Sequence, residues 1–198
     1  MHVTDRFAYA QLLGLYLGDG HINDTARSHQ LRLYLDARYP DLIDEAWAMV
    51  QLVAPDKRPV VRDGQHGPTM KLVCCGWKRW PELFPQYGPG KKHERPIVLE
   101  PWQQEIVDEH PWELLRGLLH SDGCRTINRF KTTLPSGRVA EYAYPRWFFS
   151  NESADIRGIF CRTCEAVGLR WTQPNRRNIS VSHRTSVAAL DEHVGPKA

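Results

Sequence analysis

Residues 12–20 of the chain read LLGLYLGDG, and residues 115–123 read LRGLLHSDG. Both stretches are apolar runs of helical character that end in Asp-Gly, at Asp19-Gly20 and at Asp122-Gly123. The two aspartates lie about half the chain apart, which is the spacing expected of a tandem duplication.

Small residues mark one face of each predicted helix. Gly14 and Gly18 stand four residues apart, as do Gly117 and Ser121, so each pair falls on one helical face. Helices that meet along such faces approach more closely than helices lined with leucine. The two aspartates would then arrive together at one end of the helix pair.

The paired aspartates would concentrate negative charge. Two carboxylates within ~5 Å repel by roughly 3 kcal/mol at an effective dielectric constant near 20. A fold that tolerates this repulsion commonly holds a cation there, and an all-oxygen site favours Mg²⁺. Gly20 and Gly123 follow the aspartates, where we expect each helix to end in a left-handed glycine.

Both stretches resemble the signature motif of the LAGLIDADG homing endonucleases, with Gly-Leu at 14–15 and 117–118 and the terminal Asp-Gly in both copies. The similarity is to single-chain members with two motifs, including short proteins of the actinobacterial type, and it spans nearly the whole chain. It implies an α+β fold of two pseudo-symmetric αββαββα halves. The motif helices would pack at the centre, and two antiparallel β-sheets would form a DNA-binding saddle.

The order of expected elements repeats in the two parts of the chain. The run Gln30–Leu35 alternates leucine with polar residues, which is typical of a strand with one buried face. We expect further strands at 21–23, 70–75, 124–130, 146–150 and 178–182, and helices at 41–53, 80–87, 102–107, 154–167 and 186–194. The chain is therefore divided into an N-terminal half, 1–90, a connector, 91–110, and a C-terminal half, 111–198.

The resemblance implies a site-specific endonuclease that hydrolyses phosphodiesters in both strands of duplex DNA with divalent metal ions. Asp19 and Asp122 would bind Mg²⁺ together with the backbone carbonyls of Gly18 and Ser121. Mn²⁺ should also support cleavage, and Ca²⁺ should bind without it.

Family members also place a basic residue beside each scissile phosphate, often after the last helix of a half. Lys91 or Lys92 in the first half and Lys197 in the second match that position. A polar residue at the end of the second strand commonly orders the water. Asp36 and Ser150 stand there, where family members often carry an amide, so the water network of this chain differs.

Polar and basic side chains of the expected strands and loops are candidates for DNA contact, because arginine's planar group suits both phosphate and guanine. Gln30, Arg32 and Tyr34 share one strand face, and Lys71 is out of phase with its apolar neighbours. The candidates are His21, Asn23, Gln30, Arg32, Tyr34, Arg62, Lys71, Arg125, Asn128, Arg129, Arg138, Arg146, Arg176, Arg177, Asn178, Ser180 and Ser182.

Composition sets broader limits. The 198 residues are 41% hydrophobic with a net charge of +3, and no apolar run reaches membrane-spanning length. The N-terminus lacks the apolar core of a signal peptide, so we expect a soluble, intracellular protein, in the cytoplasm or nucleoid if bacterial. Five cysteines, an odd number, fit reduced thiols. We expect a monomer, because one chain carries both motifs.

Two other functions use the same scaffold. One is a DNA-binding regulator that no longer cleaves, and the other is an RNA maturase. His120 is the one histidine near the expected site, where it would orient a water, contact DNA or simply face solvent. Because the two halves differ in nearly every residue expected to face DNA, the target should be asymmetric.

Overall fold

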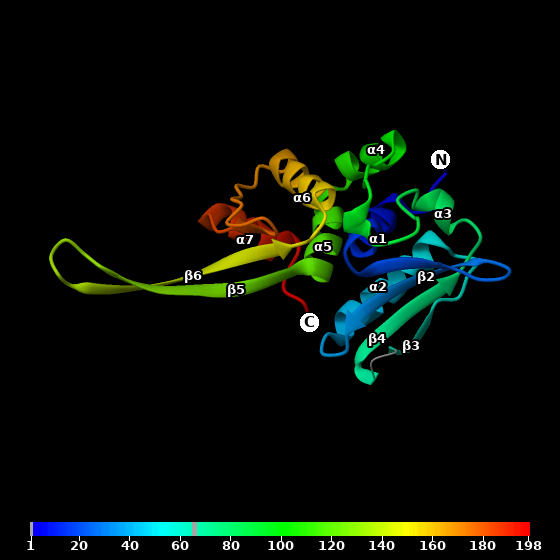
Figure 1. Cartoon of the computed structure of the whole chain (residues 1–198), viewed down its shortest axis with the longest axis horizontal. Helices are drawn as coiled ribbons and strands as arrows, with labels where there is room; N and C mark the ends of the chain where they lie inside the picture. The colour runs from blue at the N-terminus through cyan, green and yellow to red at the C-terminus, as the bar shows by residue number, and fades with distance from the viewer. Residues whose placement is uncertain (1, 65–66) are drawn as a thin grey trace.

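The computed structural model describes residues 2–64 and 67–198, and each half begins with a motif helix (Figure 1). The first half contains α1 (Arg6–Asp19), β1 (Gly20–Asp24), β2 (His29–Asp36), α2 (Pro40–Val53), β3 (Val60–Gly64), β4 (Gly67–Gly76) and α3 (Trp80–Leu83). The connector contains a short 3-10 helix (Lys92–Glu94) and α4 (Pro101–Glu109). The second half contains α5 (Pro111–Asp122), β5 (Gly123–Thr133), β6 (Val139–Ser150), α6 (Ala154–Ala166), β7 (Asn178–Val181) and α7 (Arg184–His193).

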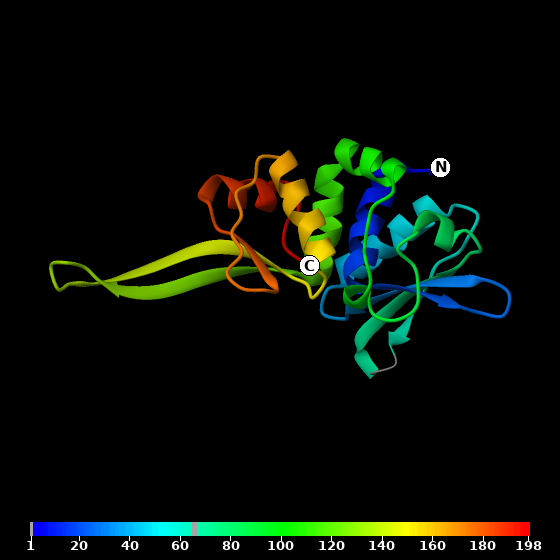
Figure 2. The same cartoon turned by 45° about the horizontal axis from the view of Figure 1, so that its top comes forward.

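The motif helices α1 and α5 lie side by side at the centre of the molecule (Figure 2). Asp5 caps α1 by accepting a hydrogen bond from the Ala8 amide at 2.8 Å, and Pro111 stands at the start of α5. Every residue from Ala8 to Leu17 is buried, because α5, α2 and β2 all pack against α1. One hydrophobic core therefore runs through both halves. No helix in the described part of the chain is long and apolar enough to cross a membrane.

The small residues of the two motifs face each other, as predicted. A Cβ built on Gly14 would lie 2.5 Å from the Leu114 carbonyl oxygen and 2.8 Å from the Cα of Gly117. One turn further on, a Cβ on Gly18 would lie 2.4 Å from the Cβ of Ser121. The helices are therefore in backbone contact, and any larger side chain would separate them.

The expectation of left-handed glycines at the helix ends is wrong. Gly20 and Gly123 have φ of −85° and −103°, and the chain passes from each helix directly into a strand. Glycine is required there for a different reason. A Cβ on Gly20 would lie 2.3 Å from the Cα of Tyr16, and one on Gly123 would lie 2.7 Å from the Cα of Leu119.

The first sheet is antiparallel with the order β1-β2-β4-β3. Leucines 31, 33 and 35 of β2 are at most 1% exposed and, with Val73 opposite Leu33, form the side of the sheet that faces the helices. We call the other side, which bears Gln30, Arg32 and Tyr34, the open side. In the second sheet the buried side chains of Trp147 and Phe149 mark the helix-facing side, and the opposite side is again called open.

The second half departs from the expected αββαββα order. Its sheet has three strands in the order β5-β6-β7, so the half reads αββαβα. The segment between α6 and β7 contributes only an isolated bridge between Thr172 and Ser180. Gly168, with φ of +74°, and Pro174 interrupt this segment and leave too few residues for a full strand.

Three element boundaries also differ from prediction. The edge strand β3 was not expected, and β6 begins at Val139 rather than at 146. The helix expected at 80–87 ends after Leu83, because Pro85 disfavours helical backbone at Phe84, whose φ and ψ are −124° and 72°. The long β5–β6 ribbon therefore projects well beyond the helices (Figure 1).

A buried hydrogen-bond network anchors the connector to the first half. The Gln103 side chain is fully buried and donates to the Tyr9 hydroxyl at 2.7 Å. Gln86 Nε2 donates to Gln103 Oε1 at 2.6 Å, and the Tyr9 hydroxyl donates to the Leu83 carbonyl at 2.5 Å. Because buried polar groups require partners, this network holds α4 in one position relative to α1.

Candidate active site

Asp19 and Asp122 are the last residues of α1 and α5, and the glycine contact places them at the same end of the helix pair. Burial, with the neighbouring charge of Asp122, raises the pKa of Asp19 to about 7. Burial also raises the pKa of Asp122, although a hydrogen bond from Asn151 opposes that rise. The folded chain therefore favours a proton or a cation at this pair.

Two lysines lie at the C-terminal ends of the motif helices. Lys92 Nζ donates to the carbonyl oxygens of residues 16, 17 and 18, the last at 3.0 Å. Lys197 Nζ donates to the Ser121 carbonyl at 2.8 Å. Burial lowers the pKa of Lys92 to about 8 and also lowers that of Lys197, while the two aspartates oppose both shifts. Both lysines thus supply positive charge beside the carboxylate pair.

Two hollows flank the helix ends, and each combines residues from different parts of the chain. One, of about 410 Å³, is lined by Asp122, Asn151 and Lys92. The other, of about 460 Å³, is lined by Asp19 and Lys197. The charges agree with this pairing, since Lys92 acts most strongly on Asp122 and Lys197 most strongly on Asp19. We call these hollows the Asp122 centre and the Asp19 centre.

Lys91 also lines the Asp122 centre, but its side chain is exposed and its ammonium is 3.9 Å from Glu94. Of the two adjacent lysines proposed from the sequence, Lys92 is the one that is buried and donates to the carbonyl oxygens at the end of α1.

The two centres differ in the polar group next to the aspartate. Asn151 Nδ2 donates to Asp122 Oδ2 at 2.6 Å, and Asn151 itself follows directly after β6. In the Asp19 centre, Asp36 at the end of β2 pairs with the guanidinium of Arg38 at 2.7 Å, which lowers the pKa of Asp36. The Asp122 centre therefore contains an amide beside its aspartate, whereas the Asp19 centre contains the Asp36–Arg38 ion pair.

Asn151 was missed in the sequence, where Ser150 was chosen for this position. Ser150 is exposed and pairs with Asn178 on the open side of the sheet. A shift of one residue along a strand reverses the direction of the side chain, so the group that reaches Asp122 comes one residue later. The sequence did offer a signal for Asn151. It is an amide residue directly after the strand whose end pairs with the residues that follow Asp122.

His120 is 3% exposed, which excludes both the DNA-facing and the solvent-facing role considered for it. Its Nε2 lies 3.2 Å from the Gly195 carbonyl oxygen and its Nδ1 lies 3.4 Å from a Glu45 carboxylate oxygen. Arg116 also donates to Glu45 at 2.7 Å. Burial acts to raise the pKa of Glu45, but hydrogen bonds from His120, Arg116 and a glutamine lower it to about 2. This cluster anchors the C-terminal segment that carries Lys197.

The donor set fits a hard divalent cation. No cluster of three or more His, Cys, Asp or Glu side chains within residues 2–64 and 67–198 is arranged to hold a metal. Two carboxylates suffice for Mg²⁺, which keeps several of its waters. The Gly18 and Ser121 carbonyls each accept a bond from a lysine, and each oxygen retains a second lone pair.

Many of the candidate DNA contacts lie on the open sides of the sheets, because directly paired residues of neighbouring strands share a face. His21 pairs with Arg32, and Asn23 with Gln30. Tyr34 and Arg62 both pair with Leu72, and Asn128 and Arg146 occupy the open side of the β5–β6 ribbon. Arg32 Nε donates to Gln30 at 2.8 Å, so these two side chains form one polar surface.

The register corrects the placement of Lys71 and Arg125. Lys71 pairs with the buried Leu35, so it lies on the helix-facing side, where it contacts Asp63 at 2.5 Å. Arg125 pairs with the buried Trp147 and forms two bonds of 2.7 Å with Asp191 of α7. Both residues were chosen as polar members of strands, but tertiary packing turns them toward the helices.

Other candidates are distributed around the second half. Ser180 is 3% exposed because the Thr172 bridge covers it, so it lies outside the open surface. Arg129 alternates with Asn128 and lies on the opposite face of the ribbon. Four of the remaining five lie in or near loops: Arg138 at the ribbon turn, Arg176 and Arg177 in contact with Glu152, and Ser182 exposed after β7. Asn178 begins β7 on its open side.

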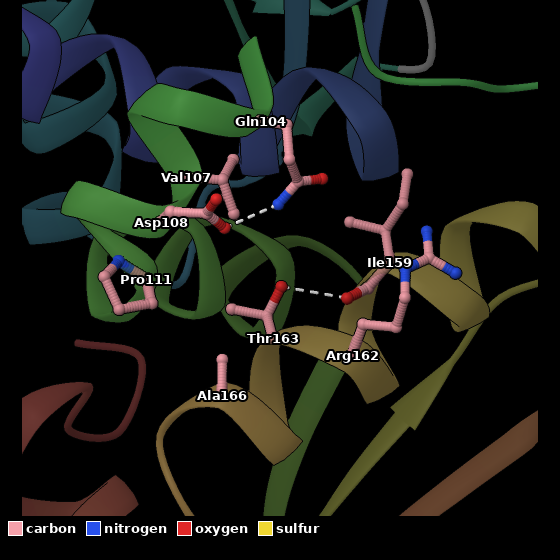
Figure 3. Close-up of a pocket in the computed structure, with 8 residues that line it drawn as sticks. All are labelled: Gln104, Val107, Asp108, Pro111, Ile159, Arg162, Thr163 and Ala166. Atoms are coloured by element: carbon pink, nitrogen blue, oxygen red, sulfur yellow. Dashed lines mark hydrogen bonds between the residues drawn. The ribbon is translucent and has the colours of Figure 1, made fainter. Parts of the chain in front are cut away.

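A further hollow of about 180 Å³ lies between α4, the start of α5 and α6 (Figure 3). Its polar side chains bond within its own wall: Gln104 donates to Asp108 at 2.7 Å, and Thr163 donates to the Ile159 carbonyl at 2.9 Å. Pro111 lines it at the end of α5 opposite Asp122. This hollow is separate from the two centres and contains none of the predicted site residues.

No family model and no curated protein matches the chain. Solved structures do. The homing endonuclease I-DmoI in complex with DNA and Mn has a TM-score of 0.60 and 14% identity, covering 96% of this chain and 97% of that one. The LAGLIDADG meganuclease I-AabMI bound to uncleaved DNA has a TM-score of 0.57 and 10% identity, covering 93% of this chain and 82% of that one.

A third similar structure is full-length DUF199/WhiA from Thermatoga maritima, with a TM-score of 0.57 and 12% identity. It covers 99% of this chain, but this chain spans only 58% of that one. At these identities the likeness is one of fold. The paired motif helices, the two antiparallel sheets and the near-complete coverage agree: this chain has the α+β fold of the LAGLIDADG homing endonucleases.

Proposed function

We propose that this protein is a site-specific endonuclease that hydrolyses phosphodiesters in both strands of duplex DNA with a divalent metal ion, Mg²⁺ by preference. The observation that carries the proposal is the pair of composite centres, in which Asp19 stands with Lys197 and Asp122 stands with Lys92. I-DmoI structures that contain DNA with Mn or with Ca support DNA as the substrate and a divalent ion as the cofactor.

The aspartates and lysines would divide the chemical work. Asp19 and Asp122 would hold the metal, which when bound lowers the pKa of a water and stabilises the leaving oxygen. Lys92 and Lys197 would bind the negatively charged phosphate, each beside the aspartate of its own centre. Asn151 would orient the Asp122 carboxylate through its 2.6 Å hydrogen bond.

The open side of the first sheet and the polar side chains on the open side of the second would contact the duplex. The first carries hydrogen-bonding side chains such as Gln30, Arg32 and Arg62, whereas the second carries Asn128 and Arg146 among aromatic residues. Because the two surfaces differ, we expect one chain to recognise an asymmetric site as a monomer. Phosphate contacts should make the affinity fall steeply with salt.

A second candidate function is DNA binding without cleavage. The hydrogen bonds from Lys92 and Lys197 to the Gly18 and Ser121 carbonyls favour it, because they place an ammonium group beside each oxygen proposed as a metal ligand and use one of its two lone pairs. Similarity to DUF199/WhiA is compatible with this function as well as with cleavage. The two candidates differ in whether bonds in DNA are broken.

A selection from a random duplex library would test the proposal. Duplexes are recovered separately as bound or as cleaved molecules, in Mg²⁺ and in Ca²⁺. The endonuclease proposal predicts cleaved products of one sequence family in Mg²⁺ only and binding in both ions. Asp19→Asn and Asp122→Asn should abolish cleavage of that sequence and retain binding. Selective binding that never yields cleavage in Mg²⁺ or Mn²⁺ would instead establish the non-cleaving function.

A further inference from the structure

Among the residues that the structure describes, no third strand pairs with the outer part of the β5–β6 ribbon. The two strands pair from Gly123 and Phe149 to Thr133 and Val139, but β7 pairs only with residues 147–150 of β6. The rest of the ribbon therefore projects from the body of the molecule, as both whole-chain views show (Figures 1 and 2). An isolated two-stranded ribbon is marginally stable in water, so its side chains require an explanation.

Aromatic rings and an arginine line the open side of this ribbon. Tyr142, Tyr144, Arg146 and Phe148 alternate along β6, and Phe130 of β5 stands directly opposite Tyr142, so all five share one face. The rings of Phe130 and Tyr142 stack at 5.2 Å, and Phe130 meets Tyr144 edge-on at 5.8 Å. We call this set of five residues the aromatic ladder.

Arg146 connects the outer rings of the aromatic ladder to the body. Its guanidinium lies 5.5 Å from the Tyr144 ring and 5.2 Å from the Phe148 ring, within cation–π distance of both. Ser150, two residues beyond Phe148 on the same face of β6, lines the Asp122 centre, whereas Cys124, opposite Phe148, lines the Asp19 centre. The aromatic ladder therefore begins beside the Asp122 centre and continues outward to rings that remain exposed, Phe130 at 42% and Tyr142 at 43%.

The charges around the aromatic ladder are complementary to nucleic acid. Between residues 126 and 146 the ribbon carries Arg129, Lys131, Arg138 and Arg146, against the single acidic residue Glu141. Lys131 pairs with Glu141, and Arg129 lies on the opposite face of the ribbon. Arg146 within the aromatic ladder and Arg138 at the ribbon turn therefore leave a net positive charge near the rings. Exposed aromatic rings interspersed with cations are typical of surfaces that bind single strands.

The open side of the first sheet suits paired bases, whereas the aromatic ladder suits unpaired bases. Gln30 and Arg32 can donate and accept hydrogen bonds at base edges, which are the parts of a base that a duplex groove presents. Phenyl rings form no hydrogen bonds with those edges, but they stack on base faces, which become accessible only when the bases are unpaired.

We propose that the aromatic ladder binds an unpaired strand of DNA by stacking bases on Phe130, Tyr142 and Tyr144, while the neighbouring arginines contact its phosphates. The choice of DNA over RNA rests on the proposed function, because the aromatic ladder starts at the Asp122 centre. Binding itself requires neither metal nor cleavage, so its test is independent of activity.

The test measures binding of a fluorescently labelled single-stranded DNA of mixed sequence to the full chain by fluorescence anisotropy, in EDTA. The same sequence is also measured as a duplex and as single-stranded RNA. Phe130→Ala and Tyr142→Ala should each weaken single-strand binding by about tenfold. Duplex binding should change by less than about twofold. Ile127→Ala and Val139→Ala are the controls, because their side chains are similarly exposed, at 50% and 59%. Ile127 lies on the opposite face of the ribbon, and Val139 lies at its outer end. Neither residue belongs to the aromatic ladder.

A purely structural role for the stacked rings makes a different prediction. Phe130→Leu keeps an apolar contact with Tyr142 but removes a stacking face, whereas Tyr142→Phe keeps the ring. We expect Phe130→Leu to lose single-strand binding and Tyr142→Phe to retain it, with circular dichroism unchanged for both.

Three outcomes would overturn the proposal. They are an equal loss of single-strand binding in the two control variants, a parallel loss of duplex binding, and tighter binding of RNA than of DNA. Absence of DNA cleavage with intact single-strand binding would instead contradict only the proposed function.

Discussion

A Cβ atom built on Gly117 would lie 2.9 Å from the Cα of Gly14 and 2.1 Å from the carbonyl oxygen of Gln11. These two glycines are the point where α1 and α5 touch through their backbones. The contact lies more than one helical turn before the aspartates, so it sets how close the two carboxylates come.

Gly14→Ala and Gly117→Ala should therefore destabilise the fold. Alanine normally stabilises a helix interior relative to glycine, but here the added methyl must push backbone atoms apart. We expect each substitution to lower the free energy of unfolding by about 1–3 kcal/mol, measured by urea denaturation. Gly158→Ala is the matched control in α6, where the nearest atom is the flexible end of Arg162. It should be neutral or stabilise by about 0.5–1 kcal/mol.

Ionisation of Asp19 should make stability depend on pH in the absence of metal. Its pKa is about 7 in the folded chain against an ordinary value of 3.8, so between these values the folded state holds a proton that the unfolded state releases. Protonated Asp19 therefore contributes to the free energy of unfolding of the wild type below about pH 4. This contribution is lost as the pH rises through 7.

Asp19→Asn removes this loss. The unfolding free energy of the variant relative to wild type should rise between about pH 4 and pH 7 and then level off. Asp56→Asn, in the exposed turn after α2, controls for removal of a surface carboxylate. Urea titrations in EDTA across this range provide the measurement, and a gap that is constant with pH would contradict the assignment.

Metal binding should follow the same ionisation. A carboxylate must lose its proton before it coordinates a cation, so Mn²⁺ affinity should weaken by up to about tenfold per pH unit below pH 7. Isothermal titration calorimetry without DNA measures this directly. The affinity of Asp19→Asn should be lower and nearly independent of pH in this interval.

Lys92 and Lys197 should affect opposite strands of the DNA. Lys92→Met impairs the Asp122 centre and Lys197→Met impairs the Asp19 centre, so each variant should slow cleavage of one strand by about 100-fold. Each variant should therefore accumulate nicked rather than linear product. The nick should lie in one strand for Lys92→Met and in the other strand for Lys197→Met. Single-turnover assays on a selected target, with the two strands labelled separately, measure both rates.

Lys91→Met provides the control for this pair, because Lys91 is exposed and faces Glu94. It should leave both strand rates within about twofold of wild type, since its charge is largely screened by solvent. If Lys91→Met slowed cleavage as much as Lys92→Met, the distinction that the structure makes between these neighbours would be wrong.

Asn151 should matter to one strand only. Removal of its hydrogen bond to Asp122 frees that carboxylate to rotate, so Asn151→Ala should slow cleavage in the Asp122 centre by about 10- to 100-fold. Ser150→Ala, one residue earlier and exposed, should have little effect on the chemistry. Equal slowing of both strands by Asn151→Ala would point to a general structural defect instead.

Salt dependence should separate arginines that face DNA from those that face the helices. Arg62 is exposed on the open side of the first sheet, so Arg62→Ala should reduce the slope of log K against log[salt] by about 0.9 if it neutralises one phosphate. Arg125→Ala should leave that slope unchanged but lower stability, because Arg125 binds Asp191 of α7. A slope change with Arg125→Ala and none with Arg62→Ala would reverse this assignment.

The repeated motif, through its resemblance to the LAGLIDADG motif, predicted the paired motif helices and the α+β fold. The spacing of Gly14 and Gly117 identified the helix faces that could meet, because glycine permits a contact that larger residues forbid. Alternation in 30–35 likewise identified the buried leucines of β2, because the two-residue period of a strand is a local property.

Tertiary structure decided which polar residues serve the site. Asn151 rather than Ser150 donates to Asp122, because a shift of one residue along a strand reverses the direction of a side chain. Lys92 rather than Lys91 is buried and donates to the carbonyl oxygens at the end of α1. Lys71 and Arg125 turn toward the helices because their cross-strand partners are buried.

The crossed pairing of aspartates and lysines is not written in local periodicity, because it depends on which segments of the folded chain lie side by side. The sequence by itself determined the helices, the acidic pair and most strands, including the three of the second sheet but not β3. Packing alone decided how these parts combine into two different centres.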